Sequence, residues 1–550
     1  MTTHIAMTNQ TMTKKQTYLL ALLSAFLMWL AWPPHNWLAP ILLVGLVPLF
    51  VALHQIINKK ETKTGKKVFL TAGLTFLVWN TASIYWVFNS INAVNTGVVG
   101  TIISLSVSLI PYCLGAFLMT SGFWLYYRLT NYTNKYLSYL GLISFYVALE
   151  YLHESWDLAF PWMTLGNGFA GLHQLAQWYE FTGVYGGSIW ILLSNILAFE
   201  LYNAYKTKQR VGKTAIALVA TIVLPIGTSL YIYSNYKEKS VPVNVVVVQP
   251  NIDPYDKYGE ISATEQLQIL AKLSDSVGQV NTEYFVWPET AIPNYADEDK
   301  IRANGDYIRT QEFLSKYKNG TLITGIESVK LYDDKRTISA KPNPNGGFYD
   351  NYNAAMQVEN SANVQFYHKS KLVPGVEKLP FPTVLSFLAP VFDKLGGSVS
   401  GWGWQDKPGV FYSQGGVGVA PVVCYESLWG SWIGESVKNG AQFITIITND
   451  GWWGNTSGKD QHLLYAKLRA IETRRWVARS ANTGISGFIN QRGDVVQQSK
   501  WWTRTALKAD INLNDNLTIY VNNGDYLAKI FSFLAVVLAL IIPYRKWVKK

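Results

Sequence analysis

Long apolar runs dominate the N-terminal part of the chain, and one more lies near its C-terminus. Each run is rich in Leu, Ile, Val, Phe and Trp and is bounded by short polar segments. Runs of this length are typical of helices that cross a bilayer. The pattern predicts eight membrane helices, of which the first two are short and are expected to form a hairpin around Pro33-Pro34. The predicted helices are Tyr18–Trp32, Trp37–Leu53, Val68–Trp86, Val98–Tyr126, Leu137–Leu152, Tyr185–Leu201, Ala215–Tyr233 and Tyr526–Pro543.

Positive charge alternates between the connections of these helices. The second-to-third, fourth-to-fifth and sixth-to-seventh connections and the C-terminal tail are basic, whereas the connections between them contain no Lys or Arg. Because Lys and Arg collect on the cytoplasmic side, both termini are predicted to lie inside and the segment after the seventh helix outside. Lys14 and Lys15 precede the first run without a clear cleavage site, so that run is expected to be a retained helix. The basic connections contain Lys59, Lys60, Lys63, Lys66 and Lys67, then Arg128 and Lys135, then Lys206, Lys208, Arg210 and Lys213, and finally Arg545, Lys546, Lys549 and Lys550.

Between Val241 and Asn523 the pattern changes to short apolar runs that alternate with helical spacing. Val243–Gln249 is almost continuously apolar, as expected of a sheet strand that is covered on both faces. The alternation predicts a layered α/β domain. The expected organisation is a membrane domain over residues 1–238, an extracytoplasmic α/β domain over 239–523, and a last membrane helix with a basic tail over 524–550. The other predicted elements are the strands Tyr284–Trp287, Thr321–Gly325, Val417–Val423 and Phe443–Thr448 and the helix Glu265–Val277.

One segment of the α/β domain departs from this pattern. Leu372–Trp404 is rich in Pro, Gly, Phe and Leu and is too irregular for a core. A long unstructured segment in a compact domain is usually functional or mobile. We therefore expect an arm that dips into the membrane interface or covers a site with its large apolar side chains. These side chains are Phe381, Leu385, Phe387, Leu388 and Phe392.

Composition and charge narrow the classes of function. The chain is 49% hydrophobic, and its formal net charge is +11. Such a charge suggests nucleic acid or an acidic surface, but most of the excess Lys and Arg flanks the apolar runs, so membrane topology explains it and no nucleic-acid partner is expected. The two cysteines, Cys113 and Cys424, are too few for a disulfide framework. No Cys/His cluster has metal-ligand spacing, so neither a metal nor a cofactor is expected.

Three chemically useful residues, Glu289, Lys369 and Cys424, each close or follow an apolar strand. Each has an ordinary alternative: a strand cysteine is most often an apolar filler, a glutamate after a strand caps it or pairs with a cation, and a lysine is usually solvated. Lys371 is a rival to Lys369, because it lies on the same side of an extended chain. Together the three residue types suit thiol acyl transfer, in which the carboxylate moves protons, the ammonium stabilises an oxyanion and the thiolate attacks a carbonyl.

A series of short motifs follows in a characteristic order along this domain. The motifs resemble those of the nitrilase, or carbon–nitrogen hydrolase, superfamily. With the flanking membrane helices and Phe160-Pro161-Trp162 in the fifth-to-sixth connection, nearly the whole chain resembles the bacterial apolipoprotein N-acyltransferases. The motifs are Gln249-Pro250-Asn251-Ile252, Trp287-Pro288-Glu289, Lys369-Ser370-Lys371-Leu372-Val373-Pro374, Cys424-Tyr425-Glu426, Thr448-Asn449-Asp450-Gly451-Trp452-Trp453-Gly454, Gln461-His462 and Ala481-Asn482-Thr483-Gly484.

The resemblance implies a fold and a catalytic triad. The implied fold is a polytopic α-helical membrane protein with an inserted α/β nitrilase-like αββα sandwich domain. The implied triad is Glu289, Lys369 and Cys424. It selects Lys369 over Lys371, because the lysine of the family stands three residues before Leu-Val-Pro.

The resemblance also implies supporting residues. Glu377 matches a glutamate that assists the site, and Tyr425 and Glu426 match functional neighbours of the cysteine. A loop tryptophan of the family falls at Tyr258, which implies an aromatic lipid contact there. The chain departs from the family at Pro374-Gly375-Val376-Glu377, where the usual sequence is Pro-Phe-Gly-Glu; the spacing to Glu377 is kept, but the loop is expected to differ in shape.

The function that the resemblance implies is apolipoprotein N-acylation at the bacterial inner membrane, with the catalytic domain on the periplasmic side. The sn-1 acyl chain of a phospholipid, with phosphatidylethanolamine the expected donor, passes through a Cys424 thioester to the N-terminal amine of a diacylglyceryl-cysteine on an apolipoprotein. A covalent intermediate of this kind implies ping-pong kinetics. Two alternatives stay open: a membrane-tethered nitrilase-type amidase that uses water as the acceptor, and a non-catalytic membrane scaffold, against which the intact triad argues.

Overall fold

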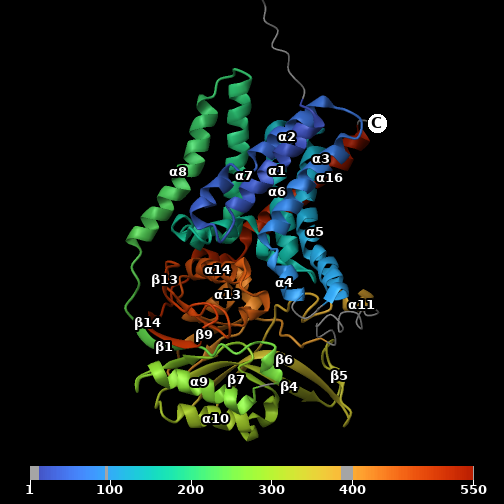
Figure 1. The fold of residues 1–550 in the computed structure, drawn as a ribbon. Helices are drawn as coiled ribbons and strands as arrows, with labels where there is room; N and C mark the ends of the chain where they lie inside the picture. Colours follow the sequence, from blue (N-terminus) through green and yellow to red (C-terminus); the bar gives the residue numbers. More distant parts are fainter. Residues whose placement is uncertain (1–11, 93–96, 260, 386–400, 549–550) are drawn as a thin grey trace, which may run out of the picture.

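Helices gather at one end of the molecule and two β-sheets at the other (Figure 1). The computed structural model describes residues 12–92, 97–259, 261–385 and 401–548. The helical end is built from α1 (Lys14–Leu30), η1 (Asn36–Leu43), α2 (Val47–Lys59), α3 (Thr64–Ser83), α4 (Trp86–Asn92), α5 (Gly97–Thr130), α6 (Lys135–Ser155), α7 (Tyr179–Lys206), α8 (Gly212–Asn235) and α16 (Tyr526–Val548). Three short 3-10 helices, η2 (Pro161–Met163), η3 (Leu165–Phe169) and η4 (His173–Leu175), connect α6 to α7.

All eight apolar runs are helical, but they are not equally suited to crossing a membrane. Among the described residues, five helices are long and apolar enough to span, or six if the bent pair α3 and α4 counts as one span. Neither α1, with 17 residues, nor α6 is among them, so the count of eight spans stays a prediction. The run predicted as one helix over Val68–Trp86 is broken before Trp86, where α4 turns away from α3 by 57°. The hairpin expected around Pro33-Pro34 is present, since α1 packs against both η1 and α2.

The α/β domain contains two sheets. The first has the strand order β14 (Thr505–Asn512), β1 (Pro242–Gln249), β2 (Tyr284–Val286), β4 (Thr321–Tyr332), β6 (Phe348–Glu359), β5 (Lys341–Pro342), with β3 (Ile292–Asp297) on β4 and β7 (Val364–His368) on β6. The second has the order β13 (Val495–Gln498), β12 (Gly487–Ile489), β11 (Val477–Ala481), β10 (Phe443–Thr448), β9 (Gly418–Val423), β8 (Phe411–Tyr412). The central strands run parallel in both, β1–β2–β4 in the first and β9–β10–β11 in the second.

The two sheets face each other and carry helices on their outer faces. Val245 and Val247 of β1 share a buried cluster with Val423 of β9 and Ile447 of β10, which places the core between the sheets. The outer face of the first sheet packs against α9 (Ala263–Val277) and α10 (Gly305–Leu314), and that of the second against α13 (Gly430–Lys438) and α14 (Ser457–Thr473). This is the αββα arrangement that the family resemblance implied. The remaining short helices are η5 (Asp256–Tyr258), η6 (Glu298–Ala303), α11 (Pro382–Leu385), η8 (Cys424–Leu428), η9 (Asp450–Trp453) and α15 (Ile519–Asn523).

Helix α14 lies between the second sheet and the membrane helices (Figure 1). Leu463 and Ala466 belong to the core beneath the sheet, whereas Tyr465 and Leu468 belong to the large cluster of the membrane domain. Because one helix contributes to both cores, the two parts of the molecule are packed as a continuous body.

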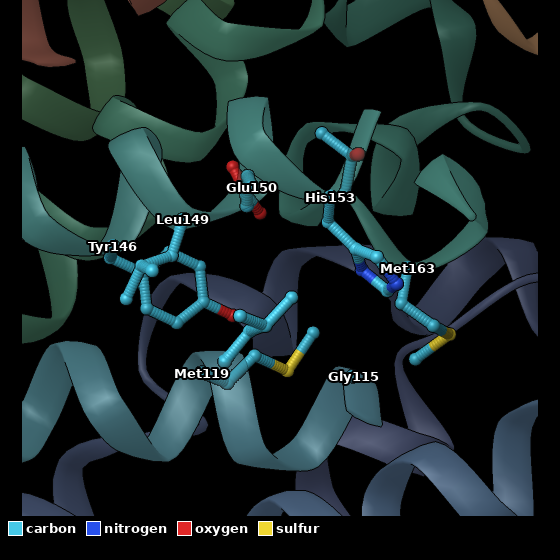
Figure 2. A pocket seen from close by; sticks show the side chains of 9 residues that line it. Gly115, Met119, Tyr146, Leu149, Glu150, His153 and Met163 are labelled. Carbon is cyan, nitrogen blue, oxygen red and sulfur yellow. The ribbon is translucent and has the colours of Figure 1, made fainter. Parts of the chain in front are cut away.

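A small pocket of about 10 Å³, lined in part by Glu150 and His153, lies between α5 and α6 in the membrane domain (Figure 2). The side chains of Glu150 and His153 from α6 lie opposite Gly115, where an added Cβ would be 2.6 Å from the Oδ1 atom of Asn80. The Oε1 atom of Glu150 accepts a hydrogen bond from the backbone N–H of Leu165 at 2.6 Å. A buried carboxylate is expensive unless it is hydrogen-bonded, and here it fixes the connection between α6 and α7.

Candidate active site

The three triad candidates lie at the ends of strands from both sheets. Glu289 follows β2 and Lys369 follows β7, both in the first sheet, whereas Cys424 follows β9 in the second. Side chains at strand ends of layered α/β domains open into the crevice where ligands bind. The sandwich therefore brings together residues that are far apart in the sequence.

The Lys369 ammonium is held between two carboxylates. Its Nζ atom lies 3.2 Å from the Oε1 atom of Glu289 and 2.7 Å from the Oε1 atom of Glu377. The Lys369 side chain is only 1% exposed. Burial alone would lower the pKa of Lys369, but the charges of Glu289 and Glu377 raise it well above its usual value. Lys369 therefore keeps its positive charge at neutral pH.

Asn353 of β6 completes this cluster and was not anticipated from the sequence. Its Nδ2 group donates to the Oε1 atom of Glu289 at 2.8 Å and to that of Glu377 at 3.3 Å. The other Glu377 oxygen accepts from the backbone N–H of Val373 at 2.8 Å, which ties the loop after Lys369 to the site. The altered sequence of this loop therefore still delivers Glu377 to the lysine.

Cys424 is the first residue of η8 and directly follows β9, at a sharp turn of the chain. Its φ of 53° is in the left-handed region, which a residue other than glycine adopts only when the surrounding structure imposes it. Burial, and then the charge of Glu289, raise the pKa of the Cys424 thiol well above its ordinary value, while Lys369 and the Thr448 hydroxyl oppose that shift. Val423 pairs with Ile447 on the parallel strand β10, so Thr448 directly neighbours the cysteine. The resting thiol is thus protonated and needs a base.

Glu426 holds the cysteine turn against the lysine segment. Its Oε2 atom accepts from the backbone N–H of Val423 at 2.9 Å. Its Oε1 atom accepts from the N–H of Ser370 at 2.6 Å, the N–H of Lys371 at 3.2 Å and the hydroxyl of Tyr367 at 2.8 Å. All four partners are donors, and the carboxylate is fully buried, so Glu426 links the two sheets at the site.

Lys371, the rival to Lys369, points to a different environment. Its ammonium lies 4.3 Å from the ring centroid of Trp432 and 5.8 Å from that of Trp429. A cation over an aromatic face is a stable arrangement in its own right. Of the two lysines, Lys369 is the one in contact with Glu289.

Comparison with known proteins identifies the chain's relatives. Residues 24–197 match the family model of the apolipoprotein N-acyltransferase N-terminal domain, and residues 244–516 match that of carbon–nitrogen hydrolase. A Chlorobaculum tepidum protein named apolipoprotein N-acyltransferase is 30% identical, over 96% of this chain and 97% of its own. Proteins of the same name from Wigglesworthia glossinidia brevipalpis and Geobacter metallireducens are 26% and 25% identical, over 88% and 94% of this chain and 91% and 93% of theirs.

The chain belongs to the apolipoprotein N-acyltransferase family. Membership confirms the resemblance drawn from the motifs and the nitrilase-like fold of the α/β domain. Together with the apolar helices, it makes the protein a multi-pass membrane protein with a carbon–nitrogen hydrolase domain. The individual roles of the site residues stay predictions.

The family resemblance also implied Tyr425 and Tyr258 as supporting residues, and the structure describes the side chain of Tyr425 but not that of Tyr258. The hydroxyl of Tyr425 donates to the backbone carbonyl of Ala159 at 2.9 Å, so this side chain reaches from the site into the membrane domain. Tyr258 lies in η5, and its side chain is outside the described part of the structure. Its neighbour Lys257 is buried and donates to the backbone carbonyl of Glu289 at 3.2 Å and to the hydroxyl of Thr290 at 2.5 Å.

The first part of the Leu372–Trp404 arm approaches the membrane domain. Lys378 pairs with Asp157 at 3.0 Å, and the backbone N–H of Phe381 donates to the same carboxylate at 2.8 Å. Three apolar residues of the predicted arm, Phe387, Leu388 and Phe392, lie outside the described residues. The lid or membrane contact of the arm therefore stays a prediction.

A second buried polar cluster lies behind Cys424 and was missed as a unit from the sequence. The two oxygens of Asp450 contact the Nδ1 atom of His462 at 3.0 Å and the Nη2 atom of Arg479 at 2.5 Å. Asp450 also accepts from the hydroxyl of Thr448 at 2.9 Å. The motifs carrying Asp450 and His462 were visible, but Arg479 gave no signal because it sits inside the short strand β11. Within the described ranges, no group of three His, Cys, Asp or Glu side chains is arranged to hold a metal ion.

Proposed function

We propose that the protein moves the sn-1 acyl chain of a phospholipid, through a thioester on Cys424, to the N-terminal amine of a diacylglyceryl-cysteine on an apolipoprotein. The observation that carries this proposal is the buried Glu289–Lys369 pair beside a protonated thiol, in a domain packed onto membrane helices. Family membership supports the acyltransferase activity and both substrate classes. Both substrates are anchored in a bilayer by acyl chains, which explains why the hydrolase-like domain carries membrane helices.

The first half-reaction makes the thioester. Glu289 takes the proton of Cys424 as the sulfur attacks the ester carbonyl of the phospholipid. The negative charge that develops on the carbonyl oxygen is stabilised by the Lys369 ammonium and by a backbone N–H. Collapse of the tetrahedral intermediate breaks the ester bond, and the lysophospholipid alkoxide leaves with the proton from Glu289.

The second half-reaction consumes the thioester. The amine of the apolipoprotein attacks the thioester carbonyl, and Glu289 again takes a proton. Breaking the carbon–sulfur bond yields the amide and returns the proton to Cys424. Lysophospholipid therefore leaves before the acceptor reacts, and the kinetics are ping-pong. The amidase alternative, with water as acceptor, is not favoured, because the family relationship extends across the membrane domain.

The catalytic domain is proposed to lie on the periplasmic face of the inner membrane. The connection between α7 and α8 and the C-terminus lie at the end of the helical bundle remote from the sheets (Figure 1). Both segments are rich in Lys and Arg, which collect on the cytoplasmic side. A membrane-impermeant thiol reagent should label a cysteine placed in the α/β domain of a Cys-free protein once the outer barrier is opened. Labelling only after lysis of the inner membrane would contradict this topology.

Mass spectrometry of the purified protein tests the chemistry. After incubation with phosphatidylethanolamine, and without acceptor, the peptide containing Cys424 should gain the mass of one acyl chain. The Cys424→Ser variant should fold and gain none, because its hydroxyl has a much higher pKa than a thiol; the Cys113→Ser variant should behave as wild type. An acyl group elsewhere, or transfer by Cys424→Ser, would refute the proposal. Addition of a diacylated peptide should discharge the thioester as amide, whereas release of free fatty acid at the same rate without peptide would favour the amidase.

A further inference from the structure

One side chain on α14 is bonded to four separate points of the membrane domain. The Oε1 atom of Gln461 accepts from the indole N–H groups of Trp86 at 3.1 Å and Trp162 at 2.7 Å. Its Nε2 group donates to the backbone carbonyls of Pro33 at 2.8 Å and Ser83 at 2.9 Å. The side chain amide has two acceptor sites and two donors, so its whole hydrogen-bonding capacity is used.

These four partners come from different elements. Pro33 lies in the hairpin between α1 and η1, Ser83 ends α3, Trp86 begins α4, and Trp162 lies in η2. Gln461 is 1% exposed. A buried amide that satisfies four groups at once is costly to replace, since each group left unpaired loses its solvation without compensation. Gln461 therefore fastens α14 to four points of the membrane domain, beside the apolar contacts of Tyr465 and Leu468.

The next residue of α14 is bonded to the cysteine turn. The Nε2 atom of His462 lies 2.7 Å from the hydroxyl of Ser427 and 3.2 Å from the carbonyl oxygen of Cys424. The other ring nitrogen contacts Asp450 at 3.0 Å. His462 is fully buried and so has little freedom to move independently of its helix. A shift of α14 is therefore transmitted to the strained turn at Cys424.

Trp162, the membrane-domain partner of Gln461 in η2, is itself packed against other aromatic rings. The ring of Trp162 lies against that of Trp86, with centroids 4.6 Å apart, and stacks on Phe160 at an interplanar angle of 17°. The segment that follows Trp162 is fixed by the bond from Leu165 to Glu150 in the pocket of Figure 2. The connection thus runs without a gap from α6 to the cysteine.

We propose that Gln461 is a positioning residue, which sets the geometry of Cys424 through His462 according to how the α/β domain is seated on the membrane helices. The inference rests on the proposed role of Cys424 as the nucleophile. Its consequence is that Cys424 reacts at full rate only while the contact at Gln461 is intact, even with a substrate that never touches the membrane domain.

The test compares Gln461→Met with Asp460→Asn in the full-length, detergent-purified protein. Methionine keeps the length of the side chain and removes all four hydrogen bonds. Asp460 is the preceding residue of α14, is 35% exposed, and pairs with Lys459 at 2.7 Å, so it provides a matched control. Thioester formation on Cys424 is measured with phosphatidylethanolamine and with a water-soluble p-nitrophenyl ester, below the melting temperature of each variant.

Gln461→Met should slow thioester formation about tenfold or more with both donors, since the loss of several buried hydrogen bonds displaces the turn. Asp460→Asn should match wild type. A second variant separates positioning from general loss of structure: Ser427→Ala removes the hydroxyl that contacts His462. If Gln461 acts through His462, the double variant Gln461→Met/Ser427→Ala loses less than the product of the two single losses.

Three results would overturn the inference. Wild-type rates for Gln461→Met would show that the contact has no influence on the turn. A loss with phospholipid alone would assign Gln461 to lipid access, and multiplicative losses in the double variant would remove His462 as the link. A wild-type protein that takes no acyl group on Cys424 from either donor would instead refute the proposed function, and the inference with it.

Discussion

Replacing Lys369 by alanine should cause the sharpest loss of thioester formation outside the nucleophile itself. The ammonium lies within 3.2 Å of Glu289 and 2.7 Å of Glu377 and is almost completely buried. Lys369→Ala leaves both carboxylates in a site of low polarity without their cation. It also removes the positive charge that is proposed to face the oxyanion.

Two magnitudes follow from the burial of this ion pair and its proposed role. Breaking a buried ion pair by removing one partner costs about 3–5 kcal/mol of the free energy of unfolding, because the remaining charge is uncompensated. Loss of a fixed oxyanion-stabilising group lowers the rate by about 10²–10³-fold. Glu289 and Glu377 would then have no cation between them, and Asn353 would remain as the donor that they share.

Lys371→Ala is the matched control, two positions along the same segment. Its ammonium contacts the rings of Trp432 and Trp429, and loss of that contact is worth about 0.5–1 kcal/mol. The assay is single-turnover formation of the Cys424 thioester at neutral pH, followed by mass spectrometry, with thermal melts in the same detergent. Lys371→Ala should remain within about threefold of wild type, since the site itself is intact. The reasoning would be refuted by the opposite ranking of the two variants, or by thioester formation at the wild-type rate in Lys369→Ala.

Two further substitutions test the buried carboxylates, Glu426 and Asp450, that support the site. Glu426→Gln replaces one of the two acceptor oxygens by an NH₂ group, which must then face a backbone N–H. We therefore expect the free energy of unfolding to fall by about 2–4 kcal/mol and thioester formation to slow. A wild-type melting temperature would show that Glu426 does not hold the two segments together. Burial opposes ionisation of Asp450, but the charges of Arg479 and His462 hold the pKa of Asp450 well below its usual range. Its contribution to stability is therefore present above about pH 4 and lost as the pH falls toward the folded-state pKa. Asp450→Asn should be less stable than wild type at pH 7, and the difference in melting temperature should shrink below about pH 4; a constant difference would exclude this linkage.

The apolar pattern predicted the helices and the continuously apolar strands well. The predicted strand Val243–Gln249 corresponds to β1, and Phe443–Thr448 is β10 with the same bounds. Such strands are buried on both faces, so every position carries the signal. The hairpin predicted around Pro33-Pro34 is also present. The bend between α3 and α4 was not predicted, because no proline or glycine marks it in the sequence.

Two of the strands that the sequence did not reveal contain polar residues whose partners are distant in the sequence. β6 carries Asn353, whose Nδ2 group donates to Glu289 and Glu377. β11 carries Arg479, which is fully buried because Asp450 neutralises it. A polar residue inside a strand is predicted to be exposed as long as its hydrogen-bond partner is unknown. Tertiary contacts determine that partner, and the local sequence pattern does not.

The motifs identified the triad candidates, but they did not predict the electrostatic environment of these residues. Sequence spacing could not show that Lys369 bridges two carboxylates, or that Cys424 is buried deeply enough to stay protonated. Nor could it show that Glu426 faces only donors. These properties arise where two sheets and a loop meet.

The protonated resting state of Cys424 leads to a last prediction, on Glu289→Gln in a Cys113→Ser background. Because the charge of Glu289 helps to raise the pKa of the thiol while Lys369 lowers it, removing that charge should lower the thiol pKa. Each unit of decrease increases the thiolate fraction about tenfold at neutral pH. Glu289→Gln should therefore be alkylated faster than its parent by iodoacetamide near pH 7, yet form no thioester from phospholipid.

Opposite effects on the two reactions would separate the charge of Glu289 from its role as a base. Alkylation needs only the thiolate, whereas acyl transfer also needs a group that accepts the thiol proton and hands it to the leaving alkoxide. If Glu289→Gln is alkylated more slowly, the carboxylate does not oppose thiolate formation and the electrostatic argument fails. If the variant still forms thioester at the parental rate, a preformed Cys424–Lys369 ion pair, and not general-base catalysis by Glu289, drives the reaction.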